Sequence, residues 1–411
     1  MYLSTLTNKN IRNYLLGGGV SRLGDVLSGM AFLFLAYDLT DSTIYTTIMA
    51  IAETIPYLLF GLIGGVIADW IPRKRLLILL DSLRIPIILS VFLFHQTGLL
   101  SFSYLLIVSF VIQTIGCFFN PAHRAILPMI TQAEQRASAN SLYDTVSRGV
   151  TILSPVLSVW LLTYGTVYFF IVDALSYGIS IVCLRKIHFT EEKNQATKTV
   201  RTAVLSIVEF FSWVRKHTKV KYLFTVTFLV VFFNTWVWQV GLLLALTELT
   251  SNSKELYSIL QGVFGAIVII TNLIIPYFIR EMTLKTYLIG ALLWGLGITY
   301  YGFMYSLTHF FIGVALVGIG LPLSSLARVY MLQTLVPENM HGRAFSSNAF
   351  LLYTANTVSL LLFGLLVIVT PIQWLMLGSG LMIIIISLAG LTISSVKQSK
   401  FRGSSPIDFY K

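Results

Sequence analysis

Long runs of apolar residues, separated by short polar segments, dominate the chain. A helix needs about 20 apolar residues to cross a hydrocarbon core, and about twelve runs approach or exceed that length. Six lie in the first part of the chain, at about residues 13–37, 43–67, 76–94, 101–128, 141–163 and 166–184. Six follow a polar break, at about residues 222–246, 257–279, 286–305, 309–331, 344–368 and 372–394. Because the runs are continuous and do not alternate, they predict helices and not a β-barrel.

The composition agrees with a membrane location. Hydrophobic residues make up 56% of the 411 positions and charged residues only 11%, against about a quarter charged in globular proteins. A soluble fold could not solvate its surface with so few charges. The sequence therefore excludes a soluble enzyme or a nucleic-acid binder, and we expect the lipid bilayer, not nucleic acid, as its surroundings.

The basic residues are unevenly distributed between the loops. They gather at 73–75, across the polar break at 185–221 and in the tail after 397. The alternate loops contain almost no Lys or Arg, and Lys254 is the exception. Loops rich in Lys and Arg stay in the cytoplasm. This pattern predicts cytoplasmic N- and C-termini and a multi-pass protein of the cell membrane, of the bacterial inner or plasma membrane type.

The polar break predicts a linker. Within it, the apolar positions repeat at helical spacing, opposite Arg201 and Glu209, and they are Val204, Ile207, Val208, Phe211 and Val214. Such a segment is typical of an amphipathic helix on a membrane surface. We expect an N-terminal six-helix half at 1–186, a cytoplasmic linker at 187–220, a C-terminal six-helix half at 221–396 and a cytoplasmic tail at 397–411.

The two halves resemble each other. Arg73 and Arg280 each follow an even-numbered run and are 207 residues apart, and Arg136 and Arg343 repeat that spacing. Two parallel repeats of six helices are typical of secondary transporters, with the substrate site between the halves. The predicted fold is an all-α polytopic membrane protein of about twelve transmembrane helices in two six-helix halves.

The segment after the second run carries a recognisable motif. It resembles the loop signature Gly-x-x-x-Asp-Arg-x-Gly-Arg-Lys of the major facilitator superfamily, with Trp70 and Pro72 as departures. The matching positions are Gly65, Asp69, Arg73 and Lys74. Opposite charges at the inner mouth can lock one helix end against another, so we assign these residues to a gate. For Lys74 the alternative is a simple basic anchor at the membrane surface.

Three further segments, 21–25, 119–122 and 139–142, resemble the macrolide-efflux and enterobactin-exporter type of drug:proton antiporter. This resemblance implies proton-coupled efflux of hydrophobic or amphipathic small molecules, drug- or siderophore-like, by alternating access. The exporter motif Gly-Pro-x-x-Gly-Gly is reduced here to the segment 154–159, which keeps only Pro155. An importer or a lipid-type carrier of the same superfamily is therefore the alternative. A non-transporting receptor or enzyme is a more remote one.

Ionisable residues within the runs are the candidates for proton coupling, because charges in the membrane are costly and usually functional. Asp25 and Glu53 lie near the middle of the first and second runs, and Arg22 is one helical turn from Asp25. For Asp25 the alternatives are a proton carrier and a static ion pair with Arg22. For Glu53 a static role is the alternative.

Other intramembrane charges predict local contacts. Asp81 with Arg84, and Asp144 with Arg148, have the spacing of ion pairs within one helix near the cytoplasmic interface. Asp173 is placed to be satisfied by Ser176 or Tyr177.

Amide and aromatic side chains are the candidates for contacting substrate, since such residues accept bulky amphipathic molecules. The candidates in the runs that the resemblance places around a central cavity are Gln113, Phe118, Asn234, Trp238 and Gln239. Trp236 fits better in an interfacial aromatic belt.

Several other activities have no support in the sequence. It has no Gly-x-x-x-x-Gly-Lys-Ser/Thr phosphate loop, and its six histidines show no metal-ligand spacing. Cys117 and Cys183 both lie within apolar runs. We therefore expect no enzyme activity, metal, cofactor or disulfide. The expected partners are a small-molecule substrate and protons, and the expected functional unit is a monomer.

Overall fold

The apolar runs of the sequence are helices. The computed structural model describes residues 6–132, 136–189, 199–279, 282–337 and 340–402, and at some helical positions, among them 62–70 and 393–402, the backbone alone. Over these residues the chain forms helices and no strand. The first half contains α2 (Lys9–Thr40), α3 (Thr43–Trp70), α4 (Arg73–Gln96), α5 (Phe102–Ile130), α6 (Arg136–Leu162) and α7 (Tyr168–Arg185).

The second half repeats this arrangement after a connecting helix, α8 (Val200–Lys216). Its first predicted span is divided into α9 (Thr218–Trp236), a turn of π-helix η2 (Val237–Gly241) and α10 (Leu242–Leu249). The remaining helices are α11 (Ser253–Phe278), α12 (Leu284–Phe303), α13 (Leu307–Leu335), α14 (His341–Leu366) and α15 (Ile372–Arg402).

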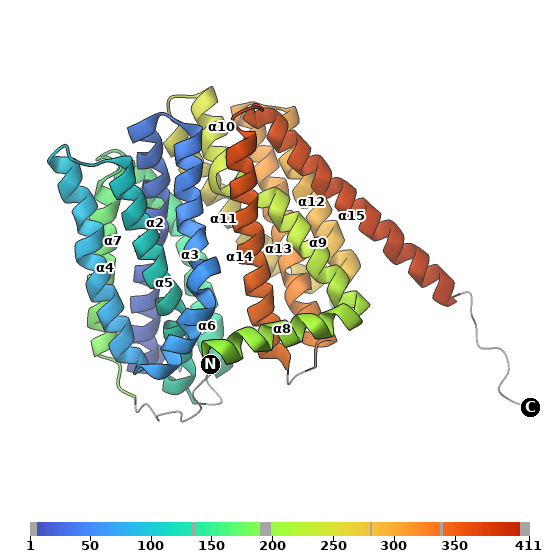
Figure 1. Cartoon of the computed structure of the whole chain (residues 1–411), viewed down its shortest axis with the longest axis horizontal. Helices are drawn as coiled ribbons and strands as arrows, with labels where there is room; N and C mark the ends of the chain where they lie inside the picture. Colours follow the sequence, from blue (N-terminus) through green and yellow to red (C-terminus); the bar gives the residue numbers. More distant parts are fainter. Residues whose placement is uncertain (1–5, 133–135, 190–198, 280–281, 338–339, 403–411) are drawn as a thin grey trace, which may run out of the picture.

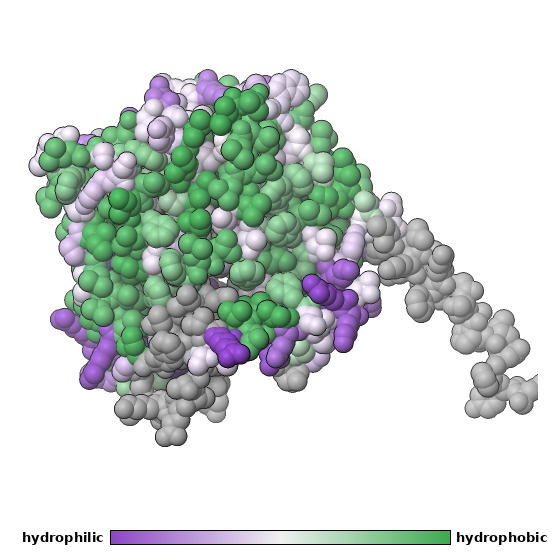
Figure 2. Space-filling model, viewed as in Figure 1, coloured by the Kyte–Doolittle hydropathy of each residue, from purple (hydrophilic) through white to green (hydrophobic). Residues whose placement is uncertain are grey.

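Most of these helices can cross a membrane. Within the described residues, ten spans, one of them the continuous segment Thr218–Leu249, are long and apolar enough to do so. The predicted spans outside that set, α6 and α12, are also helical, and Leu153–Leu162 is the apolar part of α6. Apolar side chains cover the middle of the face in Figure 2, and polar ones gather toward its ends. The chain is a multi-pass, all-α membrane protein, as predicted.

The two sets of helices lie side by side, with α8 crossing one end of the bundle (Figure 1). Helix α2 begins and α15 ends toward that same end. The packing partners repeat between the halves: α3 packs on α5 as α11 packs on α13, and α4 packs on α7 as α12 packs on α15. The internal repeat inferred from the arginine spacing is therefore visible in the helix packing, although Arg280 itself lies outside the described residues.

Glycines bring α12 into direct backbone contact with its neighbour. A Cβ atom on Gly290 would lie 2.6 Å from the backbone nitrogen of Ser324, and one on Gly320 would lie 2.5 Å from the carbonyl oxygen of Gly290. Small residues at a crossing allow helices in a membrane to pack closely, where van der Waals contact is the main source of stability. Close packing between α12 and α13 thus contributes to the stability of the second half.

Helix α8 forms where the amphipathic pattern predicts it, and part of its apolar surface packs on the protein. Thr199 caps its N-terminus by accepting a hydrogen bond from the backbone of Thr202. The buried side chains are Ile207, Phe210 and Val214, whereas Val204, Leu205 and Val208 are exposed. Phe210 faces the bundle because it packs against Phe224 of α9, with ring centres 5.9 Å apart. The exposed apolar residues are free to contact the membrane surface.

Candidate functional site

A cavity of about 380 Å³ lies between the two halves. The first half lines it from α2, α3, α5 and α6, and the second half from η2 and α11. Its polar lining includes the carboxyl groups of Asp25 and Glu53 and the amides of Gln113, Gln239 and Gln261. A concave, partly apolar space with a few convergent polar groups is the usual form of a small-molecule site.

The π-helical turn brings two consecutive side chains of the second half to this cavity. Trp238 and Gln239 both line it, although neighbours in a regular α-helix point about 100° apart. Single π-turns inside α-helices are rare and often occur at functional sites. Trp238 also packs on Phe264 of α11, with ring centres 4.1 Å apart, which fixes its orientation. Of the predicted substrate residues, Gln113, Trp238 and Gln239 lie at the cavity.

Phe118 and Asn234 lie elsewhere. Phe118 packs against a smaller apolar cluster in the first half and is not part of the lining. The Oδ1 atom of Asn234 accepts a hydrogen bond of 2.6 Å from the indole nitrogen of Trp294, inside the second half. Asn234 therefore satisfies a buried indole, a structural role that only the packing of α9 against α12 reveals.

Trp236 does not belong to an interfacial belt. It is buried, stacks on Phe363 with ring centres 4.3 Å apart, and donates a hydrogen bond of 3.0 Å to Ser379. The prediction was wrong because α9 is covered here by α14 and α15, so the indole finds its polar partner inside the protein. Gly241 gives this ring room, since a Cβ atom there would lie 2.6 Å from it.

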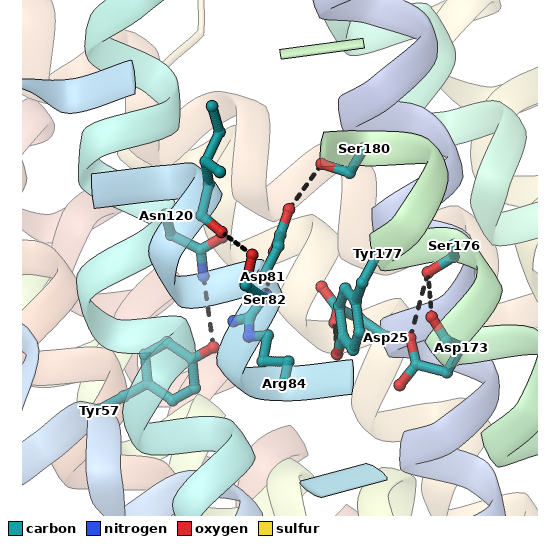
Figure 3. A network of polar contacts seen from close by, with 11 residues as sticks. Asp25, Tyr57, Asp81, Ser82, Arg84, Asn120, Asp173, Ser176, Tyr177 and Ser180 are labelled. Atoms are coloured by element: carbon teal, nitrogen blue, oxygen red, sulfur yellow. Dashed lines mark hydrogen bonds and ion pairs between the residues drawn. The ribbon is translucent and has the colours of Figure 1, made fainter. Parts of the chain in front are cut away.

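Next to the cavity, polar side chains from α2, α4 and α7 meet within the first half (Figure 3). Tyr177 donates a hydrogen bond of 2.7 Å to Oδ1 of Asp25, and Ser180 donates one of 2.7 Å to Oδ2 of Asp81. Asp173 accepts a bond of 3.3 Å from Ser176. Three acids from three helices thus share one buried region, and Asp25 connects it to the cavity.

Arg84 is the cation of this region. Its Nη1 lies 3.4 Å from Oδ1 of Asp81, so the predicted ion pair within α4 is present. Both side chains are buried in the protein: Asp81 is 0% and Arg84 2% exposed. The guanidinium carbon also lies 4.8 Å from the ring centre of Phe119 and 5.1 Å from that of Tyr177. Contacts with α5 and α7 offset the cost of burying this charge.

Arg22 is not the partner of Asp25. The ion pairs of the described residues join Arg84 to Asp81, Lys254 to Asp38, and Arg343 to Glu209. Arg22 is exposed, whereas the carboxyl group of Asp25 points to α7 and binds the hydroxyl group of Tyr177. Spacing along α2 put the two residues on one face, but packing of α2 on α7 decides which side chain reaches Asp25.

Glu53 has a different environment from Asp25. It lines the cavity from α3, yet its Oε1 atom is buried and accepts no hydrogen bond from the residues that the structure describes. Nearby, Tyr57 of α3 contacts Gln113 and Asn120 through its hydroxyl group, at 3.4 and 3.3 Å. Its ring stacks on Tyr353 of α14 with centres 5.1 Å apart, so it touches the other half.

The residues assigned to the gate are only partly described. Gly65 and Asp69 fall in the last turns of α3, and their side chains lie outside the description. Arg73 begins α4, and its Nη1 lies 3.1 Å from the sulfur of Met129. Lys74 donates hydrogen bonds to the carbonyl oxygens of Arg185 and Ile187, at 3.0 and 2.7 Å. Its contacts are within the first half, where it ties the end of α7 to the start of α4. The side chains of Asp144 and Arg148 likewise lie outside the description.

Part of the site was not among the residues selected from the sequence. Ser180 follows Asp173 and Tyr177 at helical spacing, and Tyr257 and Gln261 are one turn apart on α11, where Gln261 donates a 2.9 Å hydrogen bond to the Tyr257 hydroxyl group. Polar residues repeating on one face of an apolar run were the available signal. Among the described residues, no group of three or more His, Cys, Asp or Glu side chains is placed to hold a metal ion.

Comparison with known proteins identifies the family. The model of the Major Facilitator Superfamily matches residues 14–280, more than half of the chain. The chain belongs to this superfamily and is a membrane transporter of that type. An uncharacterized MFS-type transporter of Bacillus subtilis (strain 168), YkuC, is 24% identical over 190 residues. That match covers 46% of this chain and 44% of the relative.

Solved structures share the fold over nearly the whole chain. A peptide transporter POT in complex with sulfate matches with a TM-score of 0.75 and 14% identity, over 94% of both chains. The POT family transporter PepTSo matches with a TM-score of 0.75 and 12% identity, over 95% of this chain and 99% of that one. A mutant of the nucleoside transporter NupG matches with a TM-score of 0.70 and 13% identity, over 95% of this chain and 99% of that one. At such identities the likeness concerns the fold alone.

Proposed function

We propose that the chain is a proton-coupled exporter of hydrophobic or amphipathic small molecules, working by alternating access as a monomer in the cell membrane, with cytoplasmic termini. The observation that carries the proposal is the position of Asp25. Its carboxyl group lines the cavity between the halves and is the point at which the buried acids of the first half reach that cavity. A proton-coupling group must lie at the substrate cavity and must exchange protons with the solvent. Asp25 meets the first requirement.

Asp25 is assigned the role of proton carrier, and its neighbours are assigned the role of positioning it. The Tyr177 hydroxyl group donates a hydrogen bond of 2.7 Å to Asp25. Tyr177 in turn contacts Arg84 through its ring. When the cavity opens to one side of the membrane and then to the other, Asp25 exchanges protons with each side in turn, without having to move far within its own half.

Gln113, Trp238 and Gln239 are assigned to the substrate, because they face the same cavity from both halves. A molecule that contacts both halves stabilises one arrangement of them more than the other, and this difference drives the conformational change. Gly65, Asp69 and Arg73 remain assigned to the inner gate. Lys74 is assigned to the gate only through its hydrogen bonds to the end of α7.

A proteoliposome assay tests the proposal. The purified chain is reconstituted with an internal amphipathic fluorescent substrate, and a pH gradient is imposed in either direction. Export in exchange for protons requires that inward proton flow accelerates substrate efflux and that an uncoupler abolishes the acceleration. Uptake driven by the same gradient would favour an importer or a lipid-type carrier. Absence of any flux would favour the receptor or enzyme alternatives.

A further inference from the structure

Helices α4 and α7 pack together at the edge of the first half that lies away from the second half (Figure 1). Between them lies a groove of about 600 Å³. Ile85 and Leu89 line it from α4, and residues between Ile171 and Cys183 line it from α7, without a charged or polar side chain apart from that thiol. The groove shares no lining residue with the cavity between the halves.

The groove opens on the outer surface of the helix pair. Leu175, Ile179 and Val182 of its lining are 63%, 48% and 51% exposed, and a Cβ atom on Gly178 between them would have no atom within 4 Å. The twelve steps of α7 from Ile171 to Cys183 rise about 18 Å, slightly more than the apolar depth of one leaflet, about 15 Å. The groove therefore has the chemistry and the length for an acyl chain of the bilayer.

Three contacts fix how α4 and α7 are aligned. Each joins one residue of α4 to one of α7, and the pairs are Lys74 with Ile187, Asp81 with Ser180, and Phe92 with Tyr168. Between these pairs, each step forward along α4 matches a step back along α7, so the two helices are antiparallel in one register throughout. One step beyond the Lys74 contact, this register places Arg75 level with Lys186.

Arg75 and Lys186 end the groove with positive charge. Lys186 follows Val182 by four residues, on the same face of α7. Arg75 precedes Leu89 by fourteen residues, close to four full turns, and so lies on the groove side of α4. Both are exposed, and neither belongs to the ion pairs of the described residues. Lys74, by contrast, is bound to carbonyl oxygens at the end of α7.

We propose that this groove is a binding site for an anionic phospholipid, with one acyl chain along α4 and α7 and the phosphate at Arg75 and Lys186. Lipid tails are about as apolar as leucine, so the groove alone does not distinguish one lipid from another. The two cations supply the selectivity, because basic residues at the membrane surface attract anionic head groups. In a zwitterionic lipid the ammonium group cancels that attraction. The site is separate from the proposed transport function and lies in the leaflet at the α8 end of the bundle.

Native mass spectrometry of the purified full chain tests the head-group assignment, with phosphatidylglycerol and phosphatidylethanolamine of identical acyl chains as probes. Phosphatidylglycerol should bind about ten-fold more tightly, because two cations face its net charge. Arg75→Gln with Lys186→Gln should remove this preference. Lys219→Gln with Lys221→Gln removes two exposed cations at the start of α9 and should keep it. Equal binding of both lipids by the unaltered chain, or a preference that survives the first pair of changes, would overturn the proposal.

The same measurement tests the groove. Gly178→Leu places a side chain where the acyl chain is proposed to lie and should weaken phosphatidylglycerol binding about five-fold. Gly378→Leu is the matched control, because Gly378 of α15 is also exposed with no atom within 4 Å of an added Cβ. It should leave binding unchanged. Glycerol 3-phosphate, which has the phosphate without acyl chains, should not compete, and competition by it would replace the lipid site with a simple anion site.

A second measurement uses the unaltered chain and does not depend on the variants folding. The protein is reconstituted in phosphatidylethanolamine vesicles with a small fraction of phosphatidylglycerol that carries a photoreactive diazirine in one acyl chain. After irradiation and digestion, mass spectrometry should find the label at 85–89 and 171–183 in preference to the equally lipid-exposed residues 270–278 of α11. The same probe on phosphatidylethanolamine should label both surfaces alike. If the phosphatidylglycerol probe also labels both alike, the groove holds annular lipid only and the proposal is wrong.

Discussion

The carboxylate of Asp38 and the ammonium group of Lys254 lie 2.5 Å apart and join the two halves of the transporter. Asp38 is in the last turn of α2 and Lys254 in the first turn of α11, at the end of the bundle opposite α8. A hydrogen bond of 2.9 Å between Ser158 of α6 and Ser258 of α11 also joins the two halves. Lys254 is the exception among the loops that otherwise contain almost no basic residue. Its pair with Asp38 gives this lysine a structural role.

Asp38→Asn should favour the state that is open at this end. Both partners are partly exposed, so the pair is worth about 0.2–1 kcal/mol and its loss shifts the populations by up to about five-fold. The measurement is the labelling rate of Gly29→Cys, which lines the cavity, by an impermeant maleimide added outside. Exchanging the charges, with Asp38→Lys and Lys254→Asp together, should restore the original rate. An unchanged rate in Asp38→Asn would show that the pair does not hold the halves together.

Asp25→Asn should abolish uphill export driven by a pH gradient while leaving exchange of substrate down its own gradient. The change removes the group assigned to the proton and keeps the shape of the cavity. Counterflow and gradient-driven flux in proteoliposomes distinguish the two activities. Arg22→Gln is the control and should keep both, since Arg22 is exposed and forms no ion pair with Asp25 within the described structure. Full gradient-driven transport by Asp25→Asn would transfer the proton role to Glu53.

Asp69→Asn should slow turnover while membrane abundance stays near normal, because a gate that loses a charge no longer stabilises one of the two states. Single-turnover efflux measures the effect. Asp41→Asn is a matched control at the other end of the bundle. Asp41 has a left-handed backbone, with φ of 45°, a conformation that Asn also tolerates. If the two variants turn over at the same rate, Asp69 is not part of a gate.

Asn234→Leu should destabilise the protein and leave substrate affinity nearly unchanged. The substitution leaves the buried indole nitrogen of Trp294 without its acceptor, at a cost of about 1–3 kcal/mol. Gln239→Leu, at the cavity, should do the reverse, with weaker binding and an unaltered melting temperature. Thermal unfolding and equilibrium binding of both variants check the assignment. Loss of affinity without loss of stability in Asn234→Leu would return Asn234 to the substrate site.

The positive-inside pattern makes a prediction about topology. In a chain with Cys117 and Cys183 replaced by Ser, Lys216→Cys at the end of α8 should resist an impermeant maleimide added to intact cells. Ser251→Cys, exposed between α10 and α11 at the other end of the bundle, should react readily. Permeabilised cells should label both. The reverse pattern would place the termini outside and overturn the cytoplasmic assignment.

The sequence by itself determined the class of protein and the approximate ends of its helices. Each span must satisfy its own backbone hydrogen bonds within lipid, so a run of about 20 apolar residues carries enough information to predict a helix. For the same reason the rare acids stood out, and Asp25 and Glu53, selected only by depth, both lie at the cavity. The repeat of arginines likewise anticipated the repeated packing of the halves.

Only the tertiary structure decided which partner each polar group has. Spacing along the helix offered Arg22 as one possible partner of Asp25, but Asp25 binds Tyr177, which is 152 positions away. Asn234 and Trp236 were read as cavity and interface residues but satisfy partners inside the second half. The physical reason is that lipid and protein interior are about equally apolar, so hydrophobicity marks a span without marking its buried face. Helix packing makes that choice, and with it the position of the cavity.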